Sequence, residues 1–198
     1  MNNTLKNEAF TALRNVMSSY SPISDENWKV LEAICTFRSL EKNSYLYKMG
    51  EIPETFSFVY AGLFRAFTTD KNGNEYNKIF FDEGKFPGTM TALLTSTPSQ
   101  LSIESLELSS IVLINFNDYR RLLVKAPDLM LFHIFYLEKN WLLAKDAREI
   151  ELVQQDASKR YRRFLQEYPS ICARIPQYHI ASHLGITPTQ LSRIRKKI

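Results

Sequence analysis

The chain has 198 residues, of which 44% are apolar and 23% are charged, with 25 basic and 21 acidic side chains. This is an ordinary globular composition, with enough chain for one good core plus a small appendage or for two small domains. No apolar stretch reaches the roughly 20 residues that span a bilayer, and no signal-peptide core follows the first residues. We therefore expect no membrane partner and a cytoplasmic location.

The two cysteines, Cys35 and Cys172, lie far apart in the sequence, which favours a reducing compartment and provides neither a disulfide framework nor a CxxC motif. An iron–sulfur cluster needs about four cysteines. A lone His133 on an apolar helix is more typical of a packed side chain than of a haem ligand. His179 and His183 are four residues apart but lack a third metal ligand. No catalytic set of side chains stands out, so we expect no metal, no cofactor and no enzymatic activity.

Residues 5–34 are predicted to be helical, and Ser24 followed by two acidic residues is typical of a helix N-cap. From about residue 37 to 116, apolar and aromatic residues alternate in short runs, which indicates strands. Asn72–Gly73 favours a tight hairpin between two of them. Short strands at this spacing predict a small antiparallel barrel or roll. The predicted strands are Tyr45–Tyr47, Phe56–Tyr60, Leu63–Phe67, Tyr76–Phe81 and Ser109–Phe116.

Helix is predicted again over 118–124, and then as one long helix from Pro127 to about Gln155. Five residues recur on the long helix at spacings of 4, 3, 4 and 3, which is the repeat of a coiled-coil seam. A second apolar stripe begins at Ile134, so that one face can pack on the roll and the other on a second copy of the chain. Packing of both stripes within one chain is the alternative. The predicted dimer-interface residues are Tyr136, Asn140, Leu143, Ala147 and Ile150.

A further helix is predicted from Asp156 to Tyr168, and residues 175–198 have the spacing of a helix-turn-helix. Ala181 stands four residues before Gly185, where two steeply crossing helices need a small side chain and a residue that tolerates positive φ. Thr187 then caps a second helix, with a proline in its first turn. An amphipathic hairpin without a DNA partner is the alternative interpretation.

Charge favours the DNA interpretation. Residues 157–198 hold nine basic side chains and one acid, whereas the rest of the chain has a net charge of −4. Gln190 has an amide that can pair with adenine, and Arg193 can contact guanine or a phosphate. The basic residues at the end of the chain suit phosphates. The predicted DNA-binding residues are Gln177, His179, Thr187, Thr189, Gln190, Ser192, Arg193, Arg195, Lys196 and Lys197.

Four motifs, at residues 47–51, 58–65, 86–89 and 174–188, together with the order of the elements, resemble the Crp/Fnr family of bacterial transcription regulators. The resemblance covers nearly the whole chain. It implies an α+β fold: a cyclic-nucleotide-binding-like antiparallel β-roll (a double-stranded β-helix) flanked by helices, then a long dimerisation helix and a small all-α helix-turn-helix domain without a wing. The domains expected are 1–126, 127–155 and 156–198.

The resemblance also implies a homodimer that regulates transcription by binding a two-fold symmetric operator in double-stranded DNA. It implies an effector in or beside the roll, whose identity the residues do not give. RNA polymerase is a further candidate partner. Two other functions stay open: a ligand-binding module whose DNA binding is vestigial, and a cyclic-nucleotide-responsive regulator with an altered binding cassette.

The cassette itself departs from the family. Members that bind cyclic nucleotides hold the ribose with a Glu and the phosphate with an Arg ten residues later, but Thr89 and Ser99 stand at these positions. Burying a phosphate without a cation costs on the order of several kcal/mol, so we do not expect cyclic AMP to bind. A neutral pocket and a filled pocket that senses nothing both stay open. The predicted pocket residues are Phe81, Phe86, Gly88, Thr89, Thr91, Ser99, Gln100 and Tyr136.

Overall fold

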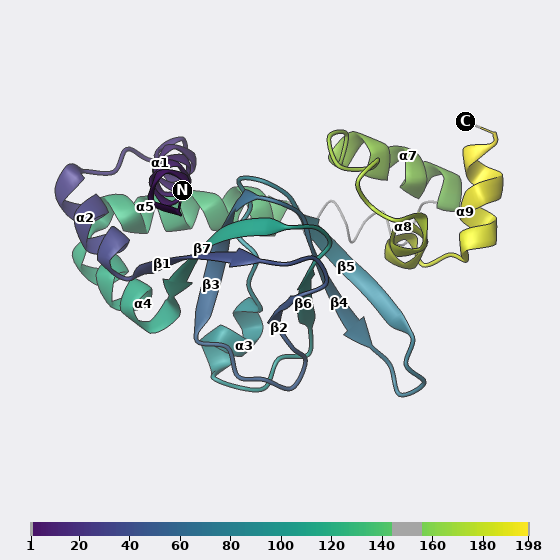
Figure 1. Cartoon of the computed structure of the whole chain (residues 1–198), viewed down its shortest axis with the longest axis horizontal. Coiled ribbons are helices and arrows are strands. Elements are labelled where there is room, and N and C mark those ends of the chain that lie inside the picture. The colour runs from purple at the N-terminus through teal and green to yellow at the C-terminus, as the bar shows by residue number, and fades with distance from the viewer. Residues whose placement is uncertain (1, 144–155, 198) are drawn as a thin grey trace.

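The structure, a computed structural model, describes residues 2–143 and 156–197 and has the predicted α+β architecture (Figure 1). The described strands are β1 (Cys35–Leu40), β2 (Tyr45–Tyr47), β3 (Thr55–Ala61), β4 (Phe64–Thr69), β5 (Glu75–Phe81), β6 (Ser102–Ser105) and β7 (Ser109–Asn115). The described helices are α1 (Asn2–Ser18), α2 (Asp25–Ala33), α3 (Met90–Thr95), α4 (Phe116–Lys125), α5 (Pro127–Leu137), the π-helix η1 (Glu138–Leu142), α7 (Ala157–Glu167), α8 (Gln177–Leu184) and α9 (Pro188–Arg195).

The strands form two antiparallel sheets, one in the order β1-β7-β3 and the other in the order β2-β6-β4-β5. Side chains from both sheets make the interior of the roll, with Val59 of β3, Phe64 of β4 and Ile111 of β7 all fully buried in one cluster. The predicted roll is therefore confirmed. The alternation that indicated strands arises because successive side chains point to opposite faces of each sheet.

The helices before and after the strands pack on one side of the roll, where α1, α2, α4 and α5 gather (Figure 1). Leu13 of α1, Leu31 of α2 and Leu129 of α5 are fully buried there and belong to one apolar cluster with Val112 of β7. Ser24 caps α2 by accepting a hydrogen bond from the Asn27 N–H, as predicted. None of the described helices is long and apolar enough to cross a membrane.

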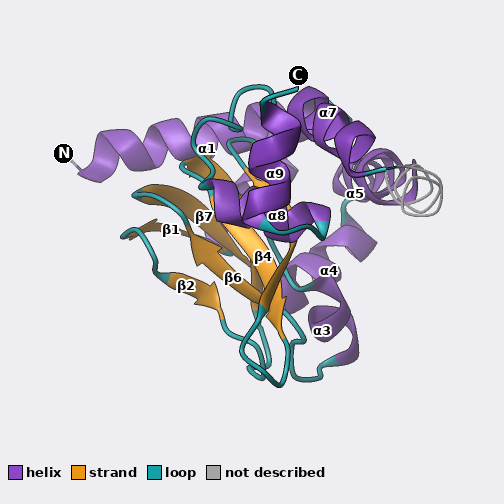
Figure 2. Cartoon of the chain, turned by 90° about the vertical axis from the view of Figure 1, so that its right-hand side faces the viewer, coloured by secondary structure: helices purple, strands orange, loops and turns teal. Residues whose placement is uncertain are grey.

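The second cluster of helices, α7, α8 and α9, forms the reader unit, defined here as residues 157–197. It lies over the sheet that contains β4 and β5 (Figures 1 and 2). Leu63, Phe80 and Leu106 of the roll share one buried cluster with Phe164 and Ile180 of the reader unit. The first four residues of β4, Phe64–Phe67, are consequently buried on both faces, which is unusual for an antiparallel strand and requires this covering layer.

The long helix predicted over 127–155 begins at Pro127, and α5 is followed by the π-helical turn of η1. Residues 144–155 lie outside the described part of the chain, and with them the predicted boundary near residue 155 and the continuation of the helix. The short helix α3 inside the roll region was not predicted; its six residues are too few to show a helical period.

Candidate nucleic-acid interface

The predicted helix-turn-helix is formed by α8 and α9. Ala181 is fully buried at the crossing of the two helices, and Gly185 adopts φ +66° in the turn between them. Leu191 anchors α9 with no exposed surface. The spacing that predicted the unit is thus explained by close packing at Ala181 and by a left-handed turn residue at Gly185.

A capping box fixes the start of α9. The Thr187 hydroxyl accepts a hydrogen bond from the Gln190 N–H at 3.2 Å, and the Gln190 amide oxygen accepts from the Thr187 N–H at 2.9 Å and from its hydroxyl at 3.2 Å. Pairing with adenine needs that amide oxygen as an acceptor, and the cap occupies it. We therefore assign Gln190 a capping role, in place of the predicted contact with adenine.

Most of the residues predicted to bind DNA are exposed and lie on or beside helix α9, with one at the start of α8. The predicted residues that the structure leaves exposed are Gln177, Thr187, Thr189, Gln190, Ser192, Arg193, Arg195, Lys196 and Lys197. His179 differs from them, because only 5% of its surface is exposed. The prediction that His179 contacts DNA is wrong, because its side chain lies on the face of α8 that packs on the roll.

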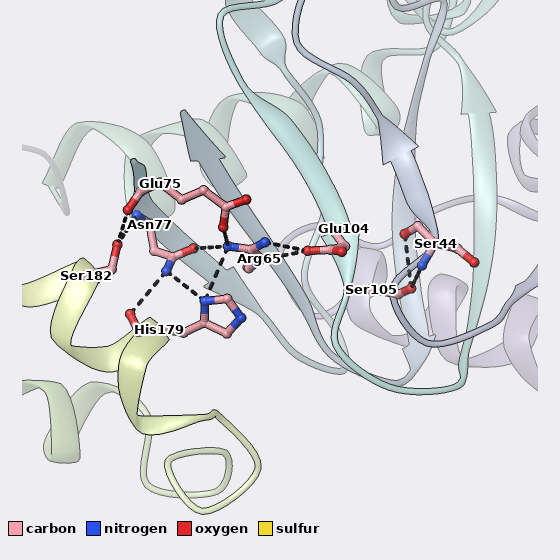
Figure 3. Close-up of polar contacts among 8 residues, drawn as sticks. All are labelled: Ser44, Arg65, Glu75, Asn77, Glu104, Ser105, His179 and Ser182. Atoms are coloured by element: carbon pink, nitrogen blue, oxygen red, sulfur yellow. Dashed lines mark hydrogen bonds and ion pairs between the residues drawn. The ribbon is translucent and has the colours of Figure 1, made fainter. Parts of the chain in front are cut away.

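His179 joins a polar network that connects the reader unit to the roll (Figure 3). Its Nδ1 lies 3.3 Å from Nη1 of Arg65 on β4 and 3.2 Å from Nδ2 of Asn77 on β5. The Asn77 amide also donates to the backbone carbonyl of His179 at 3.2 Å. One face of α8 is thereby hydrogen-bonded to the two strands beneath it.

Arg65 is the centre of this network and is 4% exposed. Its guanidinium pairs with Glu104 of β6, with Nε 2.8 Å from Oε2, and with Glu75 of β5. The central carbon of the guanidinium, Cζ, also lies 3.8 Å from the ring centroid of Phe67. A buried guanidinium needs such partners, because an uncompensated charge in the interior is strongly destabilising.

A second set of bonds holds the same face of α8. The Ser182 hydroxyl donates to the backbone carbonyl of Glu75 at 2.6 Å and accepts from the Asn77 N–H at 3.1 Å. His183 Nδ1 lies 3.2 Å from the backbone carbonyl of Asn77. β5 therefore uses its backbone groups to bind α8 where an edge strand would otherwise leave them unpaired.

The setting of His179 disfavours its charged form. Burial, together with the facing Arg65 guanidinium, lowers the pKa of His179 to about 4, although the nearby Glu75 carboxylate acts in the opposite direction. The ring is therefore neutral at physiological pH. A neutral ring keeps a lone pair on Nδ1, which the donors of Arg65 and Asn77 can share.

The sequence pattern did not indicate Arg65, Asn77 or Ser182 as functional residues. Arg65 gave one signal, because it is the single charged residue in an otherwise apolar run over 63–67. Asn77 and Ser182 gave none, since isolated polar residues at such positions are common on solvated surfaces. Their role depends on contacts between segments about a hundred residues apart.

The predicted effector residues are distributed over different parts of the fold. Phe86 packs on Tyr136, with ring centroids 5.1 Å apart, whereas Phe81 packs against the separate cluster inside the roll. Thr91 and Gln100 are exposed. Two surface hollows, one along α1 and one between α1 and α2, are lined by none of these residues.

The positions that depart from the cyclic-nucleotide cassette are both buried. Ser99 satisfies its hydroxyl locally by donating to the Leu101 carbonyl at 2.7 Å and accepting from the Leu101 N–H at 3.1 Å. Gly88 lies against β3, where an added Cβ would be 2.9 Å from Cβ of Phe56. Thr89 is 5% exposed, and its hydroxyl oxygen has no hydrogen-bond partner among the described residues. Effector binding stays a prediction.

The residues predicted to form the dimer interface do not all lie on the exposed side of the long helix. Tyr136 packs on Phe86 as described above, and the Asn140 amide donates to the Tyr20 hydroxyl at 3.0 Å, so both face their own chain. Leu143 is 65% exposed, while the predicted Ala147 and Ile150 lie outside the described residues. The exposed apolar side chains of α5, η1 and the residue after them are Met130, Leu131, Ile134, Phe135, Trp141, Leu142 and Leu143.

Comparisons with known proteins agree with this architecture. Residues 37–126 match the family model described as "Cyclic nucleotide-binding domain". A search of curated proteins found no match. Among solved structures, the chain is similar to the c-di-GMP responsive global regulator CLP of Xanthomonas campestris, with 17% identity over 88% of this chain and 91% of that one and a TM-score of 0.70.

It is also similar to FixK2 from Bradyrhizobium japonicum, with 18% identity over 83% of this chain and 84% of the other and a TM-score of 0.69. A CooA mutant from Carboxydothermus hydrogenoformans gives 18% identity over 85% and 78% of the two chains and a TM-score of 0.67. Residues 37–126 are thus similar to a cyclic nucleotide-binding domain, and the chain as a whole shares the fold of these three solved structures.

Proposed function

We propose that the protein is a homodimeric transcription regulator that reads a two-fold symmetric DNA operator with paired α9 helices. The observation that carries the proposal is the capped helix α9, whose exposed face presents Thr189, Ser192 and Arg193 beside a terminal run of basic residues. A helix of this kind fits the major groove, and two copies about 34 Å apart would meet successive turns of one DNA face. The proposed partners, operator DNA and RNA polymerase, are found in the cytoplasm, so we expect the protein there as well.

The exposed apolar surface of α5 and η1 supports the dimer. Leu131 and Phe135, each 42% exposed, are four residues apart and lie along one side of α5, and Leu142, 62% exposed, follows at the end of η1. A second copy of the chain would cover them. Light scattering should show a dimer in the wild type and a monomer in Phe135→Glu, whereas Lys125→Glu on the neighbouring α4 should leave the dimer intact.

The roll is proposed as a sensor that does not use a cyclic nucleotide. Thr89 and Ser99 supply no charge at the two positions on which the family's nucleotide binders depend, and Ser99 is satisfied by its own loop. Cyclic AMP at millimolar concentration should therefore leave the melting temperature unchanged. A ligand present at a hundred times its dissociation constant would add about 2.7 kcal/mol of stability, which a thermal melt detects easily.

Fluorescence anisotropy tests the DNA function. A DNA fragment enriched from a random pool by the wild-type protein is compared with a shuffled fragment over a salt series, with and without cyclic AMP. We expect preferential binding with a steep salt slope. Arg193→Ala/Lys196→Ala should lower affinity for the enriched fragment by about tenfold or more. Lys42→Ala/Lys71→Ala, which removes the same charge from exposed positions on the roll, is the matched control.

Two outcomes would support other functions. Equal binding of both double variants would indicate that the reader unit is vestigial and that the chain is a ligand-binding module. A melting temperature raised by micromolar cyclic AMP would indicate a nucleotide-responsive regulator with an altered cassette.

A further inference from the structure

The hydrogen-bond partners of His179 determine which ring nitrogen carries its hydrogen. The Arg65 guanidinium can only donate, and the orientation of the Asn77 amide is set by its other contacts: its oxygen lies 3.3 Å from Arg65 Nη1 and its nitrogen donates to the His179 carbonyl. Both groups therefore direct donors at the single lone pair of His179 Nδ1, at 3.3 and 3.2 Å, and share it as a bifurcated hydrogen bond (Figure 3). The hydrogen of the neutral ring must be on Nε2.

His183, one turn later on α8, has the opposite tautomer. Its Nδ1 lies 3.2 Å from the backbone carbonyl of Asn77, which can only accept, so this nitrogen carries the hydrogen. A second proton would join His183 at Nε2 and leave its contact with Asn77 intact. A second proton on His179 would join Nδ1 and break its bonds to both Arg65 and Asn77.

The charged groups around His179 strengthen this asymmetry. From β4 it faces the Arg65 guanidinium, and from β5 it faces Asn77 and the Glu75 carboxylate, while Glu104 of β6 lies on the far side of Arg65. The two carboxylates are already paired with Arg65. A proton on Nδ1 would thus point directly at a buried guanidinium.

We propose that His179 is a positioning residue, whose neutral ring latches α8 onto β4 and β5 and so fixes α9 for DNA reading, and that a single proton on Nδ1 opens this latch. The exposed face of α9 is uncovered while α8 is docked, so the latched arrangement leaves the reading surface available. A reader unit that is already held in place does not lose the conformational entropy that a loosely tethered unit would lose when it binds DNA. The effect on DNA rests on the proposed function, whereas the latch itself does not.

The size of the effect follows from linkage. An undocked His179 has an ordinary pKa of 6.5, and docking lowers the pKa to about 4. Between these two pKa values the undocked state binds more protons than the docked state, so acid favours undocking. The docking constant, which is the ratio of docked to undocked protein, should therefore fall about tenfold when the pH is lowered from 7.5 to 5.5.

Long-range proton–nitrogen correlation spectra of the full chain test the chemistry, because the chain contains only three histidines. We expect His179 to show the Nε2–H tautomer and to stay neutral to below pH 5, and His183 to show the Nδ1–H tautomer. The latch is refuted if His179 shows the Nδ1–H tautomer or titrates near pH 6.5.

Docking is measured by energy transfer between dyes on Lys71→Cys in the β4–β5 hairpin and Ala173→Cys in the reader unit, in a background with Cys35→Ala and Cys172→Ala. Loss of transfer in urea gives the docking constant at pH 7.5 and 5.5. His179→Asn keeps an acceptor near the position of Nδ1 but does not titrate, so it should lose the tenfold pH dependence. His133→Asn, on α5, should keep it. An unchanged pH dependence in His179→Asn overturns the proposal.

The DNA arm compares two variants at pH 7.5 on the enriched fragment. His179→Lys places a permanent charge against Arg65 and should bind at least about tenfold more weakly than His179→Asn. Circular dichroism establishes that both are folded. Equal affinity, or tighter binding by His179→Lys, would overturn the positioning role. If the wild-type protein binds no DNA, the proposed function fails, while the spectra and the energy transfer still decide whether the latch exists.

Discussion

Arg174, in the turn before α8, donates two parallel hydrogen bonds to the Glu83 carboxylate in the loop after β5, at 3.0 and 2.9 Å. Glu83 also accepts from the Gly62 N–H at 2.9 Å, and Arg174 pairs in addition with Glu107 in the loop between β6 and β7. One guanidinium therefore ties two loops of the roll to the reader unit. These ion pairs lie beside the apolar cluster to which Phe80 and Phe164 belong. Burial of that cluster stabilises the packing of the reader unit on the roll, and the ion pairs fix its orientation.

Replacing Arg174 by alanine should lower the free energy of unfolding by about 1–2 kcal/mol, because a bidentate pair is lost while its carboxylates stay partly exposed. A double-mutant cycle with Glu83→Gln should give a coupling energy of about 1 kcal/mol in urea unfolding. Arg121→Ala removes a more exposed ion pair with Asp118 and should change stability by less than about 0.5 kcal/mol. Equal effects of Arg174→Ala and Arg121→Ala would contradict the assigned role.

The same pair predicts a response to acid. Burial opposes the ionisation of Glu83, but hydrogen bonds from Arg174 and the Gly62 N–H outweigh it and hold the pKa below its ordinary value of 4.5. The stabilisation is therefore present above about pH 4.5 and is lost as the pH falls through the lowered value. Glu83→Gln should reduce the loss of stability below pH 4.5, as measured by urea unfolding at a series of pH values.

Gly62 should tolerate no side chain. It adopts φ +116°, and an added Cβ would lie 2.1 Å from the Ser109 hydroxyl and 2.8 Å from its Cα. Gly62→Ala should cost about 2 kcal/mol or more in thermal or urea unfolding. Gly73→Ala is the comparison, because Gly73 has a similar positive φ of +84° but open space around it, and it should cost about 1 kcal/mol. A smaller loss for Gly62→Ala than for Gly73→Ala would mean that the approach of β7 is looser than the structure indicates.

The capping box predicts an order of stability at the start of α9. Thr187→Ala removes the side-chain acceptor for the Gln190 N–H and should cost about 1 kcal/mol. Gln190→Glu retains an acceptor for the Thr187 N–H and should cost little, whereas Gln190→Ala loses it and should be intermediate. Thr189→Ala, at an exposed position in the same turn, is the control. If Gln190→Glu proved as costly as Gln190→Ala, the amide oxygen would not be serving as the cap.

Thr89 carries a buried hydroxyl without a partner among the described residues, so removing that hydroxyl should not destabilise the protein. Thr89→Val keeps the shape and should leave the melting temperature unchanged or raise the stability by up to about 1 kcal/mol. Ser57→Ala is the contrast, because the Ser57 hydroxyl is buried and donates to the Pro87 carbonyl at 3.2 Å, and it should destabilise. A clear loss of stability in Thr89→Val would reveal a partner such as a bound water or ligand.

Much of the fold could be predicted from local signals in the sequence. Ser24, Asn72–Gly73, Gly185 and Thr187–Pro188 each act within a few residues, through capping or positive φ, and the structure confirms all of them. The alternation of apolar side chains located the strands for the same reason, because the period is fixed by the backbone. The charge of the reader unit is likewise a property of composition. These features gave the architecture and the candidate DNA-binding helix.

Tertiary structure alone decided which faces meet. His179 and Arg193 are both polar residues on helices of one small unit, but α8 lies on β5 and buries the first, while α9 leaves the second exposed. Tyr136 follows a coiled-coil spacing and still packs on Phe86 of its own chain. Helical periodicity states that a face is apolar, but not which surface covers it. That choice depends on the free energy of contacts between distant segments, such as Arg65 with His179, which no local pattern in the sequence encodes.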